Sequence, residues 1–267
     1  MKLFSFKFKL IELDETDRRK RRVRPYIFRG IFMDMLKKID TSLVNNMHVP
    51  NEIRPYSINI WYHRDDIDFI LNIFNIDISR EVMEYIFGLK EQKLNVGGTD
   101  FLIKNINIDK INIGTFLKDS SPVVKFRLRF ITPTYFQKKG ADITVRFPSP
   151  TSLFTNLTHL WNEFSSKDSR IDFTDFLNWV ENNLYLTSYQ LSTKTIDIGK
   201  PDRPVGFKGW CVYINQDPNN GFSNWLDTLC RFGQLSNLGG NRTAGCGVIN
   251  YNPLEINKEE MKYNKKK

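Results

Sequence analysis

Apolar and polar side chains alternate or recur in ways that predict six elements in the first half of the chain. Residues 2–13 place Phe4, Phe6 and Phe8 on one face and Lys7 and Lys9 on the other, which predicts a half-buried strand. Apolar residues at steps of three and four predict a helix over 25–39, where a proline occupies the first turn. The remaining pattern predicts a connecting segment over 41–57, strands over 57–62, 68–74 and 100–113, and a helix over 79–87.

The second half repeats this order. It predicts a strand over 123–136, a helix over 149–164, an inserted helix over 173–184, strands over 186–197 and 206–214, a helix from residue 222 and a closing strand over 247–251. The order strand, helix, strand, strand, helix, strand occurs twice, which is the ferredoxin-like pattern. We therefore expect an α+β protein with two tandem ferredoxin-like (RRM-like) βαββαβ domains, 1–118 and 119–255. The Lys-rich tail, 256–267, is predicted to be disordered.

A glycine-rich loop precedes the closing strand. Gly233, Gly239, Gly240, Gly245 and Gly247 fall within fifteen residues. Such loops expose backbone N–H groups that bind anions such as phosphate. The order helix, loop, strand is opposite to that of a dinucleotide-binding fingerprint, and no G-K-[ST] follows, so a P-loop is excluded too. A phosphate-binding loop and a loop that merely turns tightly both remain open.

Charge favours a polyanionic partner. The net charge is +9 and the pI about 9.3, which suits nucleic acid or an anionic membrane. Every residue from 18 to 24 except Val23 is basic, and we interpret this run as a phosphate contact in preference to a solvated loop. Arg29 lies off the apolar face of its helix and can reach a ligand. The alternating Lys125, Arg127 and Arg129 face either RNA or solvent.

The sequence contains no pattern typical of a disulfide framework, a membrane span or a metal site. The three cysteines have an odd count and no metal-type spacing, so we expect reduced, buried thiols in a cytoplasmic protein. No apolar run approaches the roughly 18 residues of a membrane span, and Lys7 and Lys9 interrupt the N-terminal apolar stretch. No aspartate–histidine or multi-carboxylate cluster suggests a metal, and we expect no cofactor.

Several stretches resemble one family. The C-terminal part reads GFKGWCVYI and then WLDTLCRFGQLSNLGGNRTAGCGVINY. The central part contains FITPTYF and FPSPTSLFTNLTHLWNEF, and the N-terminal part contains FRGIFMDML and MHVPNEIRPYSI. In this order they resemble the repeat-associated mysterious protein superfamily, and within it the CRISPR-associated repeat-processing endoribonucleases. The glycine-rich end carries the most specific part of the resemblance.

The resemblance implies a fold and an activity. Members of the family have two ferredoxin-like domains side by side and bind the repeat of a precursor CRISPR RNA. They cut it once per repeat without a metal, using the ribose 2′-hydroxyl as nucleophile. The products carry a 2′,3′-cyclic phosphate and a 5′-hydroxyl. The implied partner is therefore CRISPR repeat RNA, or the mature crRNA.

The resemblance also implies site residues. His48 lies in the loop where the family places its catalytic histidine, which suits general acid–base chemistry. Arg54 matches the basic partner that stabilises charge in the transition state. Some relatives carry a tyrosine where Met33 stands, and Tyr26 or Tyr56 could replace it. The RNA-binding candidates are Arg18, Arg19, Lys20, Arg21, Arg22, Arg24, Arg29, Lys208, Asn237, Gly239, Gly240, Arg242 and Gly245.

The other two histidines and the alternative functions are interpreted as follows. His63, at a turn, and His159, off the core face of its helix, are interpreted as surface residues. The alternative function is a crRNA-binding structural subunit of a CRISPR effector complex without turnover. A membrane-surface protein is disfavoured, because the basic residues do not follow one face of an amphipathic helix. A homodimer is left open.

Overall fold

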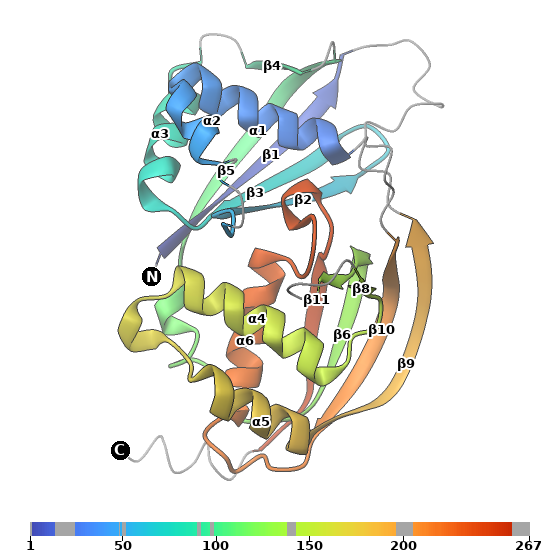
Figure 1. Ribbon diagram of the computed structural model, residues 1–267. Coiled ribbons are helices and arrows are strands. Elements are labelled where there is room, and N and C mark those ends of the chain that lie inside the picture. Colours follow the sequence, from blue (N-terminus) through green and yellow to red (C-terminus); the bar gives the residue numbers. More distant parts are fainter. Residues whose placement is uncertain are drawn as a thin grey trace.

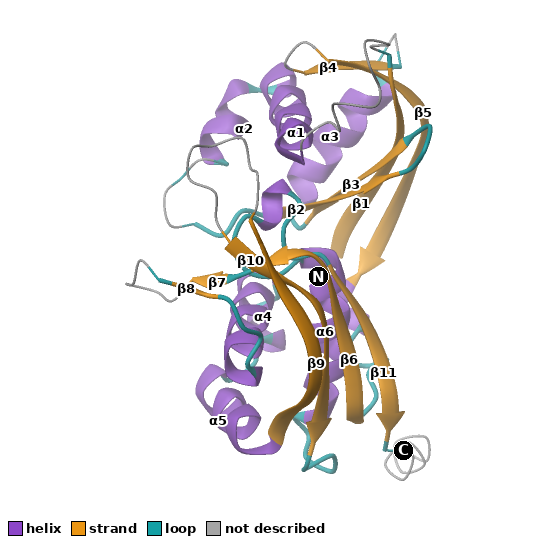
Figure 2. Cartoon of the chain, turned by 90° about the vertical axis from the view of Figure 1, so that its right-hand side faces the viewer, coloured by secondary structure: helices purple, strands orange, loops and turns teal. Residues whose placement is uncertain are grey.

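The computed structural model describes residues 2–13, 25–47, 49, 52–89, 92–96, 99–137, 143–195 and 205–257. The chain forms a mixed α+β fold whose two halves lie one above the other (Figure 1). Each half contains an antiparallel sheet, and in both halves the helices lie on the same side of the molecule (Figure 2). The other face of the C-terminal sheet is therefore left without a helical cover.

The N-terminal half holds a five-stranded sheet in the order β2-β3-β1-β5-β4. Helices α1 and α3 pack on it through apolar side chains that include Phe28, Phe32 and Val82. The elements are β1 (Lys2–Glu12), α1 (Pro25–Ile39), α2 (Thr41–Asn46), β2 (Tyr56–Tyr62), β3 (Ile67–Ile73), α3 (Ile76–Phe87), β4 (Lys93–Val96), β5 (Thr99–Asn112) and the 3₁₀ turn η1 (Ile113–Thr115).

The C-terminal half holds a four-stranded sheet in the order β11-β6-β10-β9 and a short β7–β8 ribbon. Its elements are β6 (Val123–Thr134), β7 (Phe136–Gln137), β8 (Thr144–Val145), α4 (Pro150–Phe164), η2 (Lys167–Ser169), α5 (Phe173–Asn183), β9 (Leu184–Thr195), β10 (Val205–Asn215), α6 (Ser223–Ser236), η3 (Arg242–Ala244) and β11 (Ile249–Ile256). The two sheets share a strand order. In the N-terminal sheet β1 lies between β3 and β5, with β2 beyond β3. In the C-terminal sheet β6 lies between β10 and β11, with β9 beyond β10.

The two halves share apolar contacts. Phe74, which follows β3, stacks on Phe164 at 4.7 Å between ring centroids and meets the edge of Phe232 at 5.7 Å. Leu3 and Ile113 from the N-terminal half also belong to the C-terminal core. The two sheets are therefore held together by a continuous apolar contact, in addition to the polar contacts described below.

One predicted connection is wrong. The segment 41–57 begins with helix α2. Asp40 caps this helix, because its carboxylate accepts hydrogen bonds from the backbone N–H of Ser42 at 2.8 Å and from the Ser42 hydroxyl at 2.6 Å. A side chain that accepts such bonds satisfies the free N–H groups of a first helical turn. The helix has only six residues, too few for an apolar period to show in the sequence.

Cys211, Cys230 and Cys246 are free and buried. Burial raises the pKa of the Cys211 and Cys246 thiols to about 12 and that of Cys230 well above its usual value. Among the described residues, no helix combines the length and apolar character that crossing a membrane requires.

We expect iodoacetamide at pH 8 to label the three thiols of the native protein on the order of 10³-fold more slowly than those of the urea-unfolded chain, because the thiolate is the reactive form. The unfolded thiols ionise near pH 9, whereas folded Cys211 and Cys246 ionise only near pH 12 and the pKa of folded Cys230 is also raised by burial. The free energy of unfolding should therefore fall as pH rises above 9. Mass spectrometry of labelled cysteines tests the first point. A native thiol that reacts at the unfolded rate would contradict the assigned burial.

Candidate functional site

The glycine-rich loop covers the free edge of the N-terminal sheet, beside β2 (Figure 1). Arg242 donates from Nη1 to the carbonyl oxygen of Tyr56 at 2.9 Å and from Nη2 to that of Arg54. Asn237 donates from Nδ2 to the carbonyl oxygen of Ile58 at 3.0 Å. Residues 54, 56 and 58 alternate along the chain, so their carbonyl groups share one side of it. Two side chains of the loop thus satisfy carbonyl groups that an edge strand leaves unpaired.

Arg242 is the central residue of this contact. It is only 7% exposed, and its guanidinium also donates to the carbonyl oxygen of Ser236 at 3.2 Å and lies 5.6 Å from the ring centre of Phe164. Burial lowers its pKa to about 10, so the side chain stays charged at neutral pH. Its described partners are carbonyl oxygens and an aromatic ring. The buried charge is therefore stabilised by dipoles from both halves of the protein.

The glycines allow a close backbone approach. Gly239 has a φ of 68°, and a Cβ there would lie 2.0 Å from the carbonyl oxygen of Tyr135. The N–H of Gly239 donates to Oδ1 of Asn156 at 2.9 Å, and that of Gly240 donates to the carbonyl oxygen of Tyr135 at 3.0 Å. These donors bind groups of the protein itself, so they do not form the predicted anion-binding concavity.

Four of the predicted RNA contacts have partners within the protein. Asn237 and Arg242 are buried, and their side-chain donors bind backbone carbonyls. The N–H groups of Gly239 and Gly240 also donate to protein groups. At these four positions the contacts favour the second interpretation, a tightly turning structural loop, and an RNA contact stays a prediction. Gly245 is half-buried, and its RNA contact stays a prediction.

Parts of the predicted site lie outside the described residues. These are His48 and the basic residues Arg18, Arg19, Lys20, Arg21, Arg22 and Arg24. Two of their described neighbours in sequence make contacts of their own. Pro25, which follows the basic run, lies against Gly245 of the glycine-rich loop. Met47, which precedes His48, accepts a hydrogen bond on its carbonyl oxygen from Nε of Arg54 at 3.0 Å.

Positive charge converges near the hydroxyl of Tyr56. Burial raises the pKa of Tyr56, whereas Arg29, Thr243 and Arg54 oppose the rise. The three side chains come from α1, η3 and the segment before β2. The Tyr56 hydroxyl has no partner of ordinary hydrogen-bond geometry among the described residues. Two arginines and a phenol donor therefore gather where the N-terminal helix meets the glycine-rich loop.

The candidates for a third catalytic group differ in exposure. Met33 packs against the N-terminal core and offers no proton. Tyr26 is 41% exposed, and the guanidinium of Arg29 lies 5.9 Å from its ring centre. Tyr56 is fully buried, with its ring 4.7 Å from that of Phe32. Of the two tyrosines, Tyr26 can meet a ligand from solvent, whereas the hydroxyl of Tyr56 is buried.

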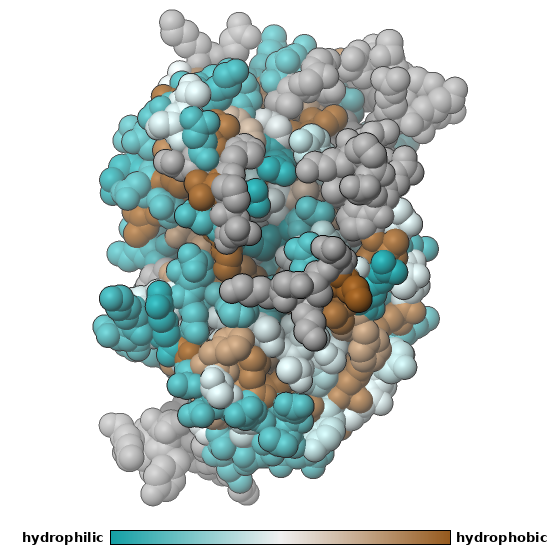
Figure 3. Space-filling view, viewed as in Figure 1, coloured by the Kyte–Doolittle hydropathy of each residue, from teal (hydrophilic) through white to brown (hydrophobic). Residues whose placement is uncertain are grey.

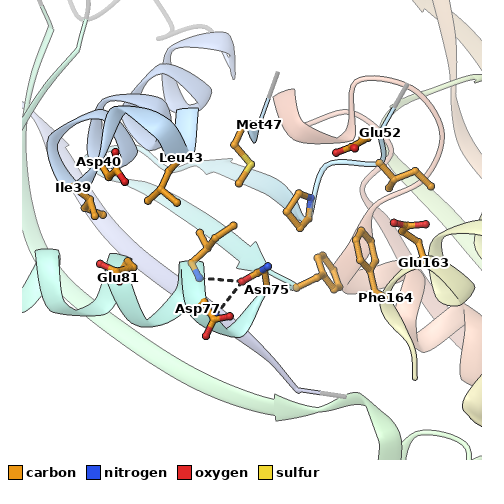
Figure 4. Close-up of a pocket in the computed structure, with 14 residues that line it drawn as sticks. Ile39, Asp40, Leu43, Met47, Glu52, Asn75, Asp77, Glu81, Glu163 and Phe164 are labelled. Atoms are coloured by element: carbon orange, nitrogen blue, oxygen red, sulfur yellow. Dashed lines mark hydrogen bonds between the residues drawn. The ribbon is translucent and has the colours of Figure 1, made fainter. Parts of the chain in front are cut away.

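A hollow of about 680 Å³ lies between the two halves, and Met47 is one of the residues that line it (Figure 4). Five carboxylates surround it, Asp40, Glu52, Asp77, Glu81 and Glu163, and its described lining contains no cation. Like charges repel, so this hollow is unsuited to a polyanion.

The remaining histidines lie elsewhere. His63 is at the β2–β3 turn, where its Nε2 is 2.9 Å from Oδ2 of Asp68. His63, Asp66 and Asp68 form a group of three potential metal ligands, which the β2–β3 hairpin brings together. The sequence pattern does not indicate this group. Nζ of Lys9 lies 3.3 Å from Asp66 and 3.2 Å from Asp68, so a cation already balances both carboxylates. His159 lies 4.5 Å from the ring of Phe173.

The surface in the view of Figure 1 is mainly hydrophilic, and apolar residues form separate patches on it (Figure 3). Lys208 is not part of the junction described above. It lies on β10 and lines a second hollow on the C-terminal sheet, together with Arg127 and Arg129. Those predicted RNA-binding residues that the structure describes thus fall into two places, the contact between the glycine-rich loop and the N-terminal half, and this sheet.

Comparison with known proteins adds an independent finding. Residues 128–249 match the sequence profile of the CRISPR-associated endoribonuclease Cas6. The resemblance inferred from the sequence is confirmed. No curated protein sequence matches the chain significantly.

Solved Cas6 structures share the fold. A Cas6 product complex superposes with a TM-score of 0.76 at 17% identity, covering 94% of this chain and 100% of that one. A Cas6 substrate mimic complex gives 0.74 at 16% identity, with coverage of 94% and 100%. Cas6 from Thermus thermophilus gives 0.73 at 13% identity, with coverage of 94% and 98%. At these identities the likeness concerns the fold.

The buried position of Arg242 predicts a large effect of its removal. Arg242→Ala should lower the free energy of unfolding by roughly 3 kcal/mol or more, because it leaves three carbonyl groups without their donor. Arg231→Ala, on the preceding helix, is the matched control. Its side chain is 31% exposed and pairs with Asp227 at 3.7 Å, so about 1 kcal/mol or less is expected. Urea unfolding of both variants measures the difference. Equal losses would contradict the anchoring role of Arg242.

Proposed function

We propose that the protein binds CRISPR repeat RNA and cleaves precursor crRNA once within each repeat. In this reaction the ribose 2′-hydroxyl attacks the adjacent phosphate, and no metal takes part. The products carry a 2′,3′-cyclic phosphate and a 5′-hydroxyl. The Cas6 profile match supports the proposal, as does the shared fold with Cas6 structures that are product and substrate mimic complexes.

The observation that carries the proposal is the hydrogen bond from Arg54 to Met47. It holds a guanidinium beside the residue that precedes His48. Cleavage by a 2′-hydroxyl needs a group that moves protons and a positive charge near the phosphorane. His48 supplies the first in the proposal, as general acid or base, and Arg54 supplies the second.

Arg29 extends this arrangement. It is half-buried on α1, and its charge, like that of Arg54, acts on the Tyr56 hydroxyl. Two guanidinium groups from separate elements can hold one phosphate more firmly than either alone. We assign Arg29 to the phosphate on one side of the cut, and we assign the basic run 18–24 to further phosphates of the same RNA.

The finer architecture belongs to the same proposal. We take 1–118 and 119–255 as two ferredoxin-like domains, with 256–267 as a tail. The shared strand order of the two sheets supports this division, and so does the boundary between η1 and β6. The proposed catalytic pair then lies in the first domain, at its contact with the loop of the second. Sedimentation of the RNA complex would show whether the protein acts alone, as a homodimer or within an effector complex.

The decisive experiment is cleavage of 5′-labelled repeat RNA in EDTA, beside the same RNA with 2′-deoxyribose at the cut site. We expect one cut in the first RNA and none in the second. His48→Ala should reduce the rate by about 10²–10⁴ and Arg54→Ala by about 10²-fold, with little change in RNA affinity. His159→Ala, which removes an exposed histidine from α4, is the control and should leave the rate unchanged.

Two outcomes would reject parts of the proposal. An unchanged rate in His48→Ala would remove His48 from the mechanism. Tight binding of repeat RNA without any cut would reject the endoribonuclease and favour a structural subunit that holds crRNA.

A further inference from the structure

The exposed face of the C-terminal sheet carries a second concentration of charge, away from the junction. Its two central strands are β6 and β10, flanked by β11 and β9. Along β10, Phe207, Cys211 and Tyr213 are buried in the core, so Lys208 and Trp210 lie on the opposite face. None of the helices that the structure describes covers that face (Figure 2).

A hollow of about 840 Å³ follows this face. Four cations line it, Arg127, Arg129, Lys194 and Lys208, and its described lining contains no carboxylate. They come from three neighbouring strands, so they form a broad surface of one sign. Such a surface attracts a polyanion, in contrast to the acidic hollow beside Met47.

Trp210 gives this surface an aromatic centre. It lies beside Arg129 on β6 and beside Gln190 on β9 in the strand register. The guanidinium of Arg127 lies 5.2 Å from its ring centre, and its Nε1 donates to Oε1 of Gln190 at 3.2 Å. The ring is therefore held from two sides by neighbouring strands. An aromatic ring fixed in this way can stack on a base at a low cost in side-chain entropy.

Gly209 allows the backbones of β9 and β10 to approach closely beside the ring. It has a φ of 132° at a register shift of β10, and a Cβ there would lie 1.9 Å from the carbonyl oxygen of Gln190. A glycine in a central strand marks a bulge or a close backbone approach. Gly209 also lines the hollow, between Lys208 and Trp210. The absent side chain thus lets β9 pack closely against β10 between Lys208 and Trp210.

We propose that this face, centred on Trp210, binds a single-stranded segment of RNA by base stacking and phosphate contacts. Four-stranded sheets of RRM domains bind single-stranded RNA through aromatic side chains on the exposed face. A duplex is a poorer fit, because its bases are already stacked on one another and cannot reach the ring. The inference rests on the proposed function to the extent that the single strand is the part of the precursor flanking the cleaved site.

The test is binding of fluorescein-labelled decauridine, a single strand that forms no duplex. Trp210→Ala should weaken binding about tenfold, and Trp210→Tyr should retain most of it, because a tyrosine ring still stacks. The double variant Arg129→Gln/Lys208→Gln should lower the slope of log K against log salt concentration by about 1.4, that is about 0.7 for each lost phosphate contact.

The matched control is Lys167→Gln/Arg170→Gln, which removes two exposed cations from the helical side of the same half. It should leave affinity and slope nearly unchanged. Wild-type affinity in both Trp210→Ala and Arg129→Gln/Lys208→Gln would overturn the inference. So would equal losses in the control, because binding would then follow net charge alone. The variant Arg129→Gln/Lys208→Gln changes only side chains on the sheet surface, so it still tests the inference if Trp210→Ala fails to fold.

The two proposals can fail separately. If the wild-type protein cuts no repeat RNA, the proposed activity fails, while decauridine binding still reports on the sheet. If repeat RNA is cut but decauridine binds all variants equally, only the sheet proposal fails. Loss of binding to phosphatidylserine vesicles in these variants, with decauridine binding unchanged, would overturn the RNA assignment in favour of a membrane surface.

Discussion

The edge of β2 is the constraint on which the site depends. An antiparallel sheet leaves the outer carbonyl groups of its last strand without partners. Here a buried guanidinium and an amide from the other half of the chain provide them, through Arg242 and Asn237. Because the charge of Arg242 is buried, its hydrogen bonds to the carbonyl groups of residues 54, 56 and 236 are costly to break, and they tie the loop to the backbone before and within β2.

Much of the fold follows from the sequence, because its main elements are long and amphipathic. Helix α1 begins and ends as its apolar period predicts, and the alternation of β1 places Phe6 and Phe8 in the core. Helix α2 was missed, because six residues contain too little of a helical period. The sequence feature that marks the start of α2 is its N-cap, Asp40, whose side chain accepts a hydrogen bond from the N–H of Ser42.

The site was harder to predict, for a physical reason. Glycine and arginine serve equally well in a phosphate-binding loop and in a tightly packed junction, and only tertiary contacts separate these roles. The sequence pattern singles out the segment 237–248, but it does not show that Arg242 points inward to backbone carbonyls. The gathering of Arg29 and Arg54 near the Tyr56 hydroxyl joins two separate segments, α1 and the chain around the start of β2, and no periodicity relates them. Pairs of this kind become visible only when the chain is folded.

The charge pattern divides the molecule by function. Carboxylates surround the hollow on one side of Met47, whereas arginines gather near Tyr56 and cations cover the exposed C-terminal sheet. A polyanion would thus be repelled from the acidic hollow and drawn to the other two surfaces. The two attractive surfaces share strand β6: it carries Arg127 and Arg129, and its end at Pro133 and Tyr135 binds the glycine-rich loop. An RNA held on the sheet would therefore contact an element directly joined to the loop that fixes Arg54. Binding and proposed catalysis then depend on one continuous piece of the C-terminal half, although the proposed catalytic residues belong to the N-terminal half.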